Sequence, residues 1–231
     1  MKNGFAAVRH RKVCTLMLVF LSLLVLATSA RAAMVFFDDF EDGDHSGWFV
    51  SSMGGSSSTG VTEYNESQMA YVQHTGAYNY VLSHDFTYVS NGILSFDMQA
   101  VTVGGAYSTD AWAGVTISFL DDFNSTLGYV RLLNNTTGSL GEFDRLVDQC
   151  QHSYENSFAD FALLAGLDSS APINTVSLQF WAQAQTADGN NHSWATVWFD
   201  DVKVESAPVP PAILLLGSGM IGLWGVRRRQ R

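Results

Sequence analysis

The chain has 231 residues, with 12 Lys or Arg against 22 Asp or Glu and a formal net charge of −10. All 22 acidic residues lie at positions 33–206, where only Arg131, Arg145 and Lys203 are basic, so this segment carries a formal charge of −19. Such a charge repels phosphate backbones and anionic lipid surfaces, which argues against nucleic acid as a partner. Divalent cations or neutral, hydroxyl-rich molecules are the natural counterparts, although the same acidity also keeps a secreted protein soluble.

The first 32 residues have the three parts of a secretory signal peptide. A basic segment precedes an apolar stretch at residues 13–28. Ala30 and Ala32 then supply the small side chains that signal peptidase requires at positions −3 and −1. We therefore expect signal peptidase to remove residues 1–32, so that the mature chain begins at Ala33. The basic residues are Lys2, Arg9, Arg11 and Lys12.

Residues 33–206 are predicted to form one β-rich domain, because 174 residues suffice for a single substantial core. The segment 93–100 alternates between apolar and polar side chains, which is the pattern of a half-buried strand. Similar alternation at residues 113–119, 130–132 and 176–184 predicts further strands, with turn-rich segments between them. Several strands without alternating amphipathic helices predict an all-β fold, an antiparallel two-sheet jelly-roll sandwich. The predicted inner residues are Leu94, Phe96, Met98, Ala100, Ala113, Val115, Ile117, Phe119, Val130, Leu132, Val176, Leu178, Phe180, Ala182 and Ala184.

One part of this domain does not show the alternation. Residues 142–166 are ambiguous, and we expect a short helix there before a strand that starts near Ile173. Once Cys14 is removed with the signal peptide, Cys150 is the only thiol, so no disulfide forms within the chain. Neither a nucleophile motif, a metal-binding histidine spacing nor a phosphate loop is present. These observations predict a non-enzymatic domain.

Acidic motifs mark both edges of the predicted domain. Residues 37–43 read FDDFEDG and residues 197–204 read VWFDDVKV. Together they resemble the first and last strands of galactose-binding-like jelly rolls, the fold shared by many carbohydrate-binding modules. The resemblance implies adjacent termini and a structural calcium. Its implied ligands are Glu41 and one of Asp200 and Asp201, with Asp39 as a further ligand.

Two interpretations of these acids remain open. Carboxylate oxygens suit calcium, which takes six to eight oxygen ligands. Alternatively, the acids only protect exposed strand edges from pairing with another chain.

Aromatic side chains on predicted polar faces indicate a binding surface. Trp181 shares its face of the strand with Gln179 and Gln183, opposite an apolar face. Flat rings interleaved with amides suit a sugar, because the ring covers the apolar face of a pyranose while the amides meet its hydroxyls. The alternative is that a bulge at Asp200-Asp201 shifts the alternation and places the tryptophans in the core. The predicted glycan-binding residues are Trp181, Gln179, Gln183, Trp194, Trp198 and Tyr71.

The end of the chain, residues 207–231, has three parts. A proline motif with Pro208 and Pro210 lies at the start of the tail. The 18 uncharged residues at 209–226 would reach about 27 Å as a helix and span a bilayer. A basic cluster at 227–229 follows, which by the positive-inside rule stays in the cytoplasm. This tail resembles the PEP-CTERM sorting signal of Gram-negative bacteria, in a proline-valine-proline variant, which implies an exosortase as processing enzyme. A plain C-terminal anchor is the alternative. The basic residues are Arg227, Arg228 and Arg229.

We therefore expect an exported protein that is held in the inner membrane and then sorted to the cell surface or the extracellular matrix. Its predicted activity is non-catalytic binding of extracellular polysaccharide, with a structural calcium. Two alternatives remain open: a polysaccharide hydrolase or lyase on the same scaffold, and a purely structural surface protein.

Overall fold

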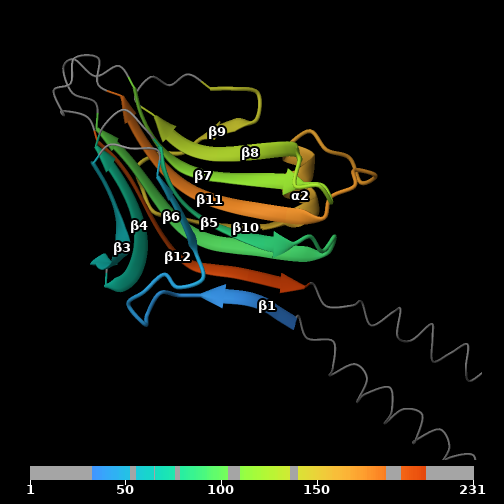
Figure 1. The fold of residues 1–231 in the computed structure, drawn as a ribbon, viewed down its shortest axis with the longest axis horizontal. Helices are drawn as coiled ribbons and strands as arrows, with labels where there is room; N and C mark the ends of the chain where they lie inside the picture. The colour runs from blue at the N-terminus through green and yellow to red at the C-terminus, as the bar shows by residue number, and fades with distance from the viewer. Residues whose placement is uncertain are drawn as a thin grey trace, which may run out of the picture. The chain divides into compact units, whose positions relative to one another are not determined.

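The computed structural model describes residues 33–52, 56–64, 66–75, 79–103, 110–135, 140–185 and 194–206. These residues form two β-sheets packed face to face (Figure 1). The expected signal peptide and the predicted sorting signal at 207–231 lie outside the described residues. Within the described ranges, no helix is both long and apolar enough to cross a membrane.

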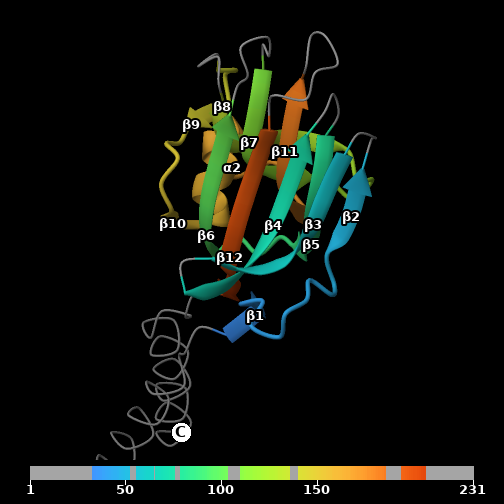
Figure 2. The same cartoon turned by 90° about the vertical axis from the view of Figure 1, so that its left-hand side faces the viewer.

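The first sheet contains the two strands that open and close the domain. Its strands run in the order β10 (His152–Ser157), β6 (Gly92–Val103), β12 (Trp194–Ser206), β4 (Ser67–Thr75) and β3 (Ser56–Tyr64). β1 (Ala33–Asp38) also pairs with β12. Figure 2 shows β6, β12, β4 and β3 side by side. The first and last strands are therefore neighbours, as the jelly-roll resemblance implies.

The second sheet positions the candidate site. Its order is β2 (Phe49–Ser52), β5 (Asn79–Thr87), β11 (Thr175–Gln185), β7 (Asp110–Leu120), β8 (Thr126–Asn135) and β9 (Asp144–Leu146). The two-sheet all-β sandwich is confirmed, but it is not antiparallel throughout, because β8 and β9 pair in parallel. A side-chain contact explains this register: Asp144 of β9 forms an ion pair with Arg131, its register partner on β8.

Alternation of side chains builds the core between the sheets. In β6 every second residue from Leu94 to Ala100 is at most 1% exposed, and the predicted inner residues of β7 and β11 are fully buried. Phe180 of β11 and Phe199 of β12 stack with ring centroids 3.7 Å apart and 5° between their planes. These two rings join the sheets at the centre. The predicted inner faces of these strands are confirmed.

The ambiguous segment contains a short helix, as expected. α2 (Phe158–Leu164) follows β10, and the hydroxyl of Ser157 caps it by accepting a hydrogen bond of 3.0 Å from the Asp160 amide. Phe158 and Phe161 are at most 2% exposed and pack into the core. The strand expected near Ile173 begins at Thr175.

Candidate functional site

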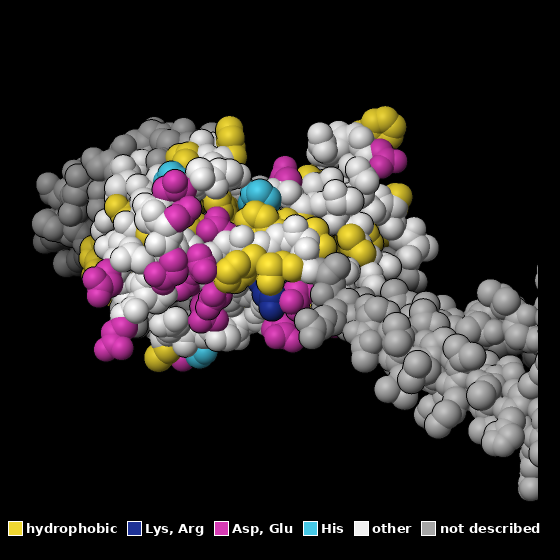
Figure 3. Space-filling view, turned by 90° about the horizontal axis from the view of Figure 1, so that it is seen from below, with side chains coloured by type: hydrophobic (Ala, Val, Ile, Leu, Met, Phe, Trp, Pro, Cys, Tyr) yellow, Lys and Arg dark blue, Asp and Glu magenta, His cyan; other side chains and the backbone are white. Residues whose placement is uncertain are grey.

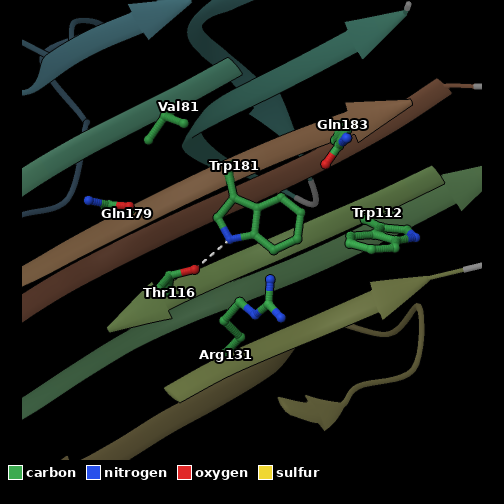
Figure 4. Close-up of a pocket in the computed structure, with 7 residues that line it drawn as sticks. All are labelled: Val81, Trp112, Thr116, Arg131, Gln179, Trp181 and Gln183. Atoms are coloured by element: carbon green, nitrogen blue, oxygen red, sulfur yellow. Dashed lines mark hydrogen bonds between the residues drawn. The ribbon is translucent and has the colours of Figure 1, made fainter. Parts of the chain in front are cut away.

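A pocket of about 160 Å³ lies on the outer face of the second sheet. Its walls come from four neighbouring strands, β5, β11, β7 and β8 (Figure 4). Pockets that enclose drug-sized ligands measure roughly 300–1,000 Å³, so this one suits a single sugar ring or an equally small polar group. The lining residues are Val81, Trp112, Thr116, Arg131, Gln179, Trp181 and Gln183.

Trp181 forms the floor of this pocket. Strand alternation turns it outward, because Phe180 and Ala182 on either side belong to the core. Its indole nitrogen donates a hydrogen bond of 2.8 Å to the hydroxyl of Thr116 on β7. Its register partner on β7 is Gly114, where a Cβ would come within 2.2 Å of a β8 backbone oxygen. Only glycine fits at this position, because the β8 backbone lies directly against it.

The exposure of Trp181 differs from the expectation. The sequence leaves two placements open, an exposed ring on a sugar-binding face or a ring in the core, whereas Trp181 faces outward with only 7% of the residue accessible. The physical reason is the position of the indole on the sheet: its nitrogen is hydrogen-bonded to Thr116 on the next strand, and it lies among the other side chains that line the pocket. Trp181 is thus neither in the inter-sheet core nor an open platform.

Arg131 is the charged residue in the lining of this pocket. Its Nε and Nη2 atoms bind the two carboxylate oxygens of Asp144 at 2.7 and 3.0 Å. The buried Asp144 also accepts a hydrogen bond of 2.7 Å from the Gly141 amide, which fixes the carboxylate. A bidentate pair of this kind neutralises the guanidinium and holds it in one orientation. Nη1 takes no part in the ion pair, so the pocket gains a fixed hydrogen-bond donor with little net charge.

Two glutamine amides flank the indole along β11. Gln179 and Gln183 stand two residues before and after Trp181, so all three point outward. Trp112 of β7 is the register partner of Gln183. Its indole nitrogen is buried and, among the described residues, has no hydrogen-bond partner. The pocket therefore combines two indole rings with amide, hydroxyl and guanidinium groups.

Sequence reasoning missed four of the seven lining residues. Thr116 and Trp112 carry the same signal as Trp181, since they alternate with the apolar Ala113 and Val115 on β7. Arg131 alternates in the same way between two apolar residues of β8. Val81 has no distinguishing sequence signal.

The six predicted glycan-binding residues divide between two faces. Trp181, Gln179 and Gln183 meet in the pocket on the second sheet. Trp194 and Trp198 lie on β12 and Tyr71 on β4, all in the first sheet. β12 has a bulge between Asp200 and Lys203, where the sequence suggested it, but both tryptophans precede it and keep their outward orientation. The core separates the two groups.

Of the four predicted calcium ligands, Asp39 and Glu41 lie close enough to Asp201 for their charges to interact, and Asp200 is the neighbour of Asp201 in the chain. Figure 3 shows acidic side chains gathered on one face of the domain. Asp200 is 5% exposed, and its carboxylate accepts hydrogen bonds from the Ser67 hydroxyl (2.6 Å) and the Asp201 amide (2.8 Å). Burial raises the pKa of Asp200 to about 6. Burial, followed by the charges of Asp97, Asp39 and Glu41, raises the pKa of Asp201.

This grouping falls short of a formed metal site. Within the described part of the chain, no three His, Cys, Asp or Glu side chains are arranged to hold a metal ion. Glu41 accepts a hydrogen bond of 3.4 Å from the Gln68 amide, and Asp39 accepts one of 3.3 Å from the Glu41 amide. The oxygen donors suit calcium in kind, but the side chains do not converge on one point.

Comparisons with known proteins give only distant structural likenesses. No family model matches the chain, and no curated protein matches it. The CBM22-1 xylan-binding domain from Paenibacillus barcinonensis is similar with a TM-score of 0.43 and 14% identity, over 77% of this chain and 97% of that chain. A family 11 carbohydrate-binding module from Clostridium thermocellum, in complex with a β-1,3-1,4-mixed-linked tetrasaccharide, is similar with a TM-score of 0.41 and 15% identity. That match covers 75% of this chain and 94% of that chain. A carbohydrate-binding module of the β-sandwich superfamily is similar with a TM-score of 0.42 and 12% identity, over 72% of this chain and 60% of that chain. The fold assignment therefore rests on the two sheets themselves.

Proposed function

We propose that this protein is a non-catalytic binder of neutral polysaccharide, exported and retained at the cell surface or in the extracellular matrix. The observation that carries the proposal is the pocket around Trp181. An indole with hydroxyl, amide and guanidinium groups around it suits a sugar, which has an apolar C–H face and a ring of hydroxyls.

Charge supports a neutral rather than an acidic ligand. The formal charge of −19 on residues 33–206 repels polyanions, and the one cation in the pocket lining is already neutralised by Asp144. An acidic sugar would therefore find no free positive charge among the lining residues. A neutral glycan is not repelled by the net charge and does not need a free cation in the pocket.

The alternative of a hydrolase or lyase finds less support at this pocket. Glycosidases place two carboxyl groups across the scissile bond, roughly 5 to 10 Å apart. The residues that line the pocket include no Asp or Glu. Cys150 is exposed and is not among the lining residues. Release of reducing ends from a bound polysaccharide would establish the enzymatic alternative.

Location is part of the same proposal. The signal peptide ending at Ala32 and the tail with Pro208, Pro210 and the terminal arginines support export, processing by an exosortase and delivery to extracellular polysaccharide. Intact mass of the protein from cells with and without exosortase tests this. A mature species from Ala33 to about Pro208 that depends on the enzyme supports sorting, whereas an unprocessed tail in both strains contradicts it.

A structural calcium ion is the second component of the proposal. The support is electrostatic, because Asp39, Glu41 and Asp97 each repel the carboxylate of Asp201 and a divalent cation offsets this repulsion. Glu41 with Asp200 or Asp201 would hold the ion, and Asp39 would assist. The ion would stabilise the junction of β1 and β12 and takes no part in sugar binding.

The binding experiment uses a panel of immobilised neutral polysaccharides: mixed-linkage β-glucan, xylan, β-1,4-galactan, mannan and dextran. We expect the full-length protein to be retained by at least one without product release. Gln183→Ala should weaken retention roughly 2- to 10-fold, the value of one hydrogen bond, without changing the melting temperature. Phe123→Ala, at an 87% exposed aromatic outside the pocket, is the matched control. No retention on any member overturns the proposal.

A further inference from the structure

The outer face of the first sheet carries its own aromatic group, formed by Tyr64, Tyr71 and Trp198. Tyr64 of β3 and Trp198 of β12 stack with centroids 4.8 Å apart and 14° between the ring planes. β4 runs between those strands, and its outward residue Met69 is fully buried. Tyr71 of β4 is the register partner of Trp198 and lies over Gly60, where a Cβ would come within 3.3 Å of the ring. Aromatic rings from three adjacent strands thus lie on the same outer face of the sheet.

Two buried polar groups at this surface lack hydrogen-bond partners among the described residues. Thr196 lies on β12 with its outward neighbours Trp194 and Trp198 on either side, and its hydroxyl has no partner although the residue is only 2% exposed. Gln99 of β6 is a register partner of Trp198, and its Oε1 atom also has none. Its Nε2 atom donates to the Gln149 carbonyl at 2.7 Å, which fixes the amide. Leaving the hydrogen bond of a buried polar group unmade costs free energy. A ligand that supplies hydroxyl donors removes that cost.

We propose that this face, formed by Tyr64, Tyr71, Trp198, Thr196 and Gln99, is a second carbohydrate-binding surface, and that one chain of this protein thereby joins two polysaccharide strands. The proposal rests on the proposed function of the pocket. The two sites lie on the outer faces of sheets that pack against each other, so they point in opposite directions. A single sugar segment cannot reach both.

The two sites differ in form. The pocket on the second sheet encloses one small unit, whereas the partly exposed rings of Tyr71 and Trp198 lie on an extended sheet face. The pocket therefore fits a chain end or a side branch, and the sheet face fits the length of a chain. A protein with both would act as a cross-link in a polysaccharide gel.

The test determines how many oligosaccharides bind to each full-length chain and whether the protein cross-links polysaccharide. We would use the panel polysaccharide that retains the wild-type protein most strongly, together with oligosaccharides cut from it. Native mass spectrometry gives the number bound per chain, and viscosity of the soluble polysaccharide reports cross-linking. The variants are Trp181→Ala, Trp198→Ala and the double substitution, with Gln183→Ala and Tyr71→Ala in case a tryptophan variant fails to fold. Phe123→Ala is again the control.

We expect two oligosaccharides per wild-type chain, one in each single variant and none in the double variant. Each single variant should lose the rise in viscosity, and its retention on dense polysaccharide should fall roughly 100-fold because avidity is lost. One oligosaccharide per wild-type chain, unaffected by Trp198→Ala, overturns the second surface and leaves the pocket intact. Absence of any binding overturns the proposed function itself. Binding that depends on Trp198 alone overturns the pocket and the cross-link together.

Discussion

Trp181 and Thr116 lie on adjacent strands, and the indole nitrogen of the first donates a hydrogen bond of 2.8 Å to the hydroxyl of the second. This bond lays the indole flat against the sheet and thereby shapes the pocket.

Replacing Thr116 with Val keeps the shape of the side chain and removes the acceptor. The indole N–H then lies buried without a partner, so we expect a loss of about 1–2 kcal/mol in unfolding free energy and weaker retention on polysaccharide. Denaturant unfolding and affinity electrophoresis measure the two effects. Ser118→Ala, on the same outward side of β7 but outside the pocket, is the control. Unchanged values in Thr116→Val would mean that the bond contributes nothing.

The ion pair of Arg131 with Asp144 should determine which sugars the pocket accepts. Asp144→Asn removes the neutralising charge, so we expect a loss of about 1–3 kcal/mol in stability and a shift in preference toward uronic acids over neutral sugars. Competition with glucuronate and glucose measures this preference. Asp148→Asn is a control, because that carboxylate is exposed and pairs with His152 instead. A preference that does not move would show that Arg131 is not in contact with the ligand.

The raised pKa of Asp200 predicts an unusual pH dependence of the stability of the domain. Its pKa of about 6 in the folded protein lies above the ordinary value of 3.8, so the native state binds more protons than the unfolded chain between these values. Stability should therefore rise as the pH falls from 7 to 5, by a few degrees in melting temperature. The measurement is made in chelator, so that no cation competes with the proton. Asp200→Asn should flatten the profile, and a profile that is equally steep in the variant would assign the effect to another group.

A bound calcium ion should favour the ionised carboxylates at this end of the domain, whereas a low pH favours the protonated form of Asp200. Bound cation favours ionised carboxylates, so we expect chelation at pH 7.5 to lower the melting temperature by several degrees and added calcium to restore it. Glu41→Gln should remove the response. Magnesium at the same concentration serves as a comparison, because it binds fewer protein ligands. A melting temperature that is insensitive to both cations would remove Glu41 and Asp200 as ligands.

Strand alternation was sufficient to predict the core and the outward side of Trp181. Such a pattern assigns each side chain to a face, which is why Leu94, Phe96 and Phe180 are buried as expected. It does not say which strands share a sheet. Trp198 and Trp181 therefore looked like members of one surface, although long-range pairing places β12 and β11 in different sheets.

The exposure of Trp181 depended on contacts that no local pattern contains. Thr116 and Arg131 reach it only because β7 pairs with β11 and β8 pairs with β7. Thr116 and Arg131 lie 65 and 50 positions before Trp181 in the sequence, so no local pattern links them to it. The same holds for the bond between Ser67 and Asp200, whose sequence separation is 133 residues.

The position of β12 has a mechanical consequence. β12 is an interior strand of its sheet, with β6 on one side and β4 and β1 on the other, and it continues to Ser206 at the C-terminal boundary of the domain. Tension applied to the chain beyond Ser206 therefore pulls along β12 and loads the ladder hydrogen bonds on both of its sides in shear, all at once. A terminal strand at a sheet edge would instead peel away one bond at a time. Trp198 lies on this same strand, so a polysaccharide held at the proposed second surface would transmit force to the end of the domain along a single strand that is paired on both sides.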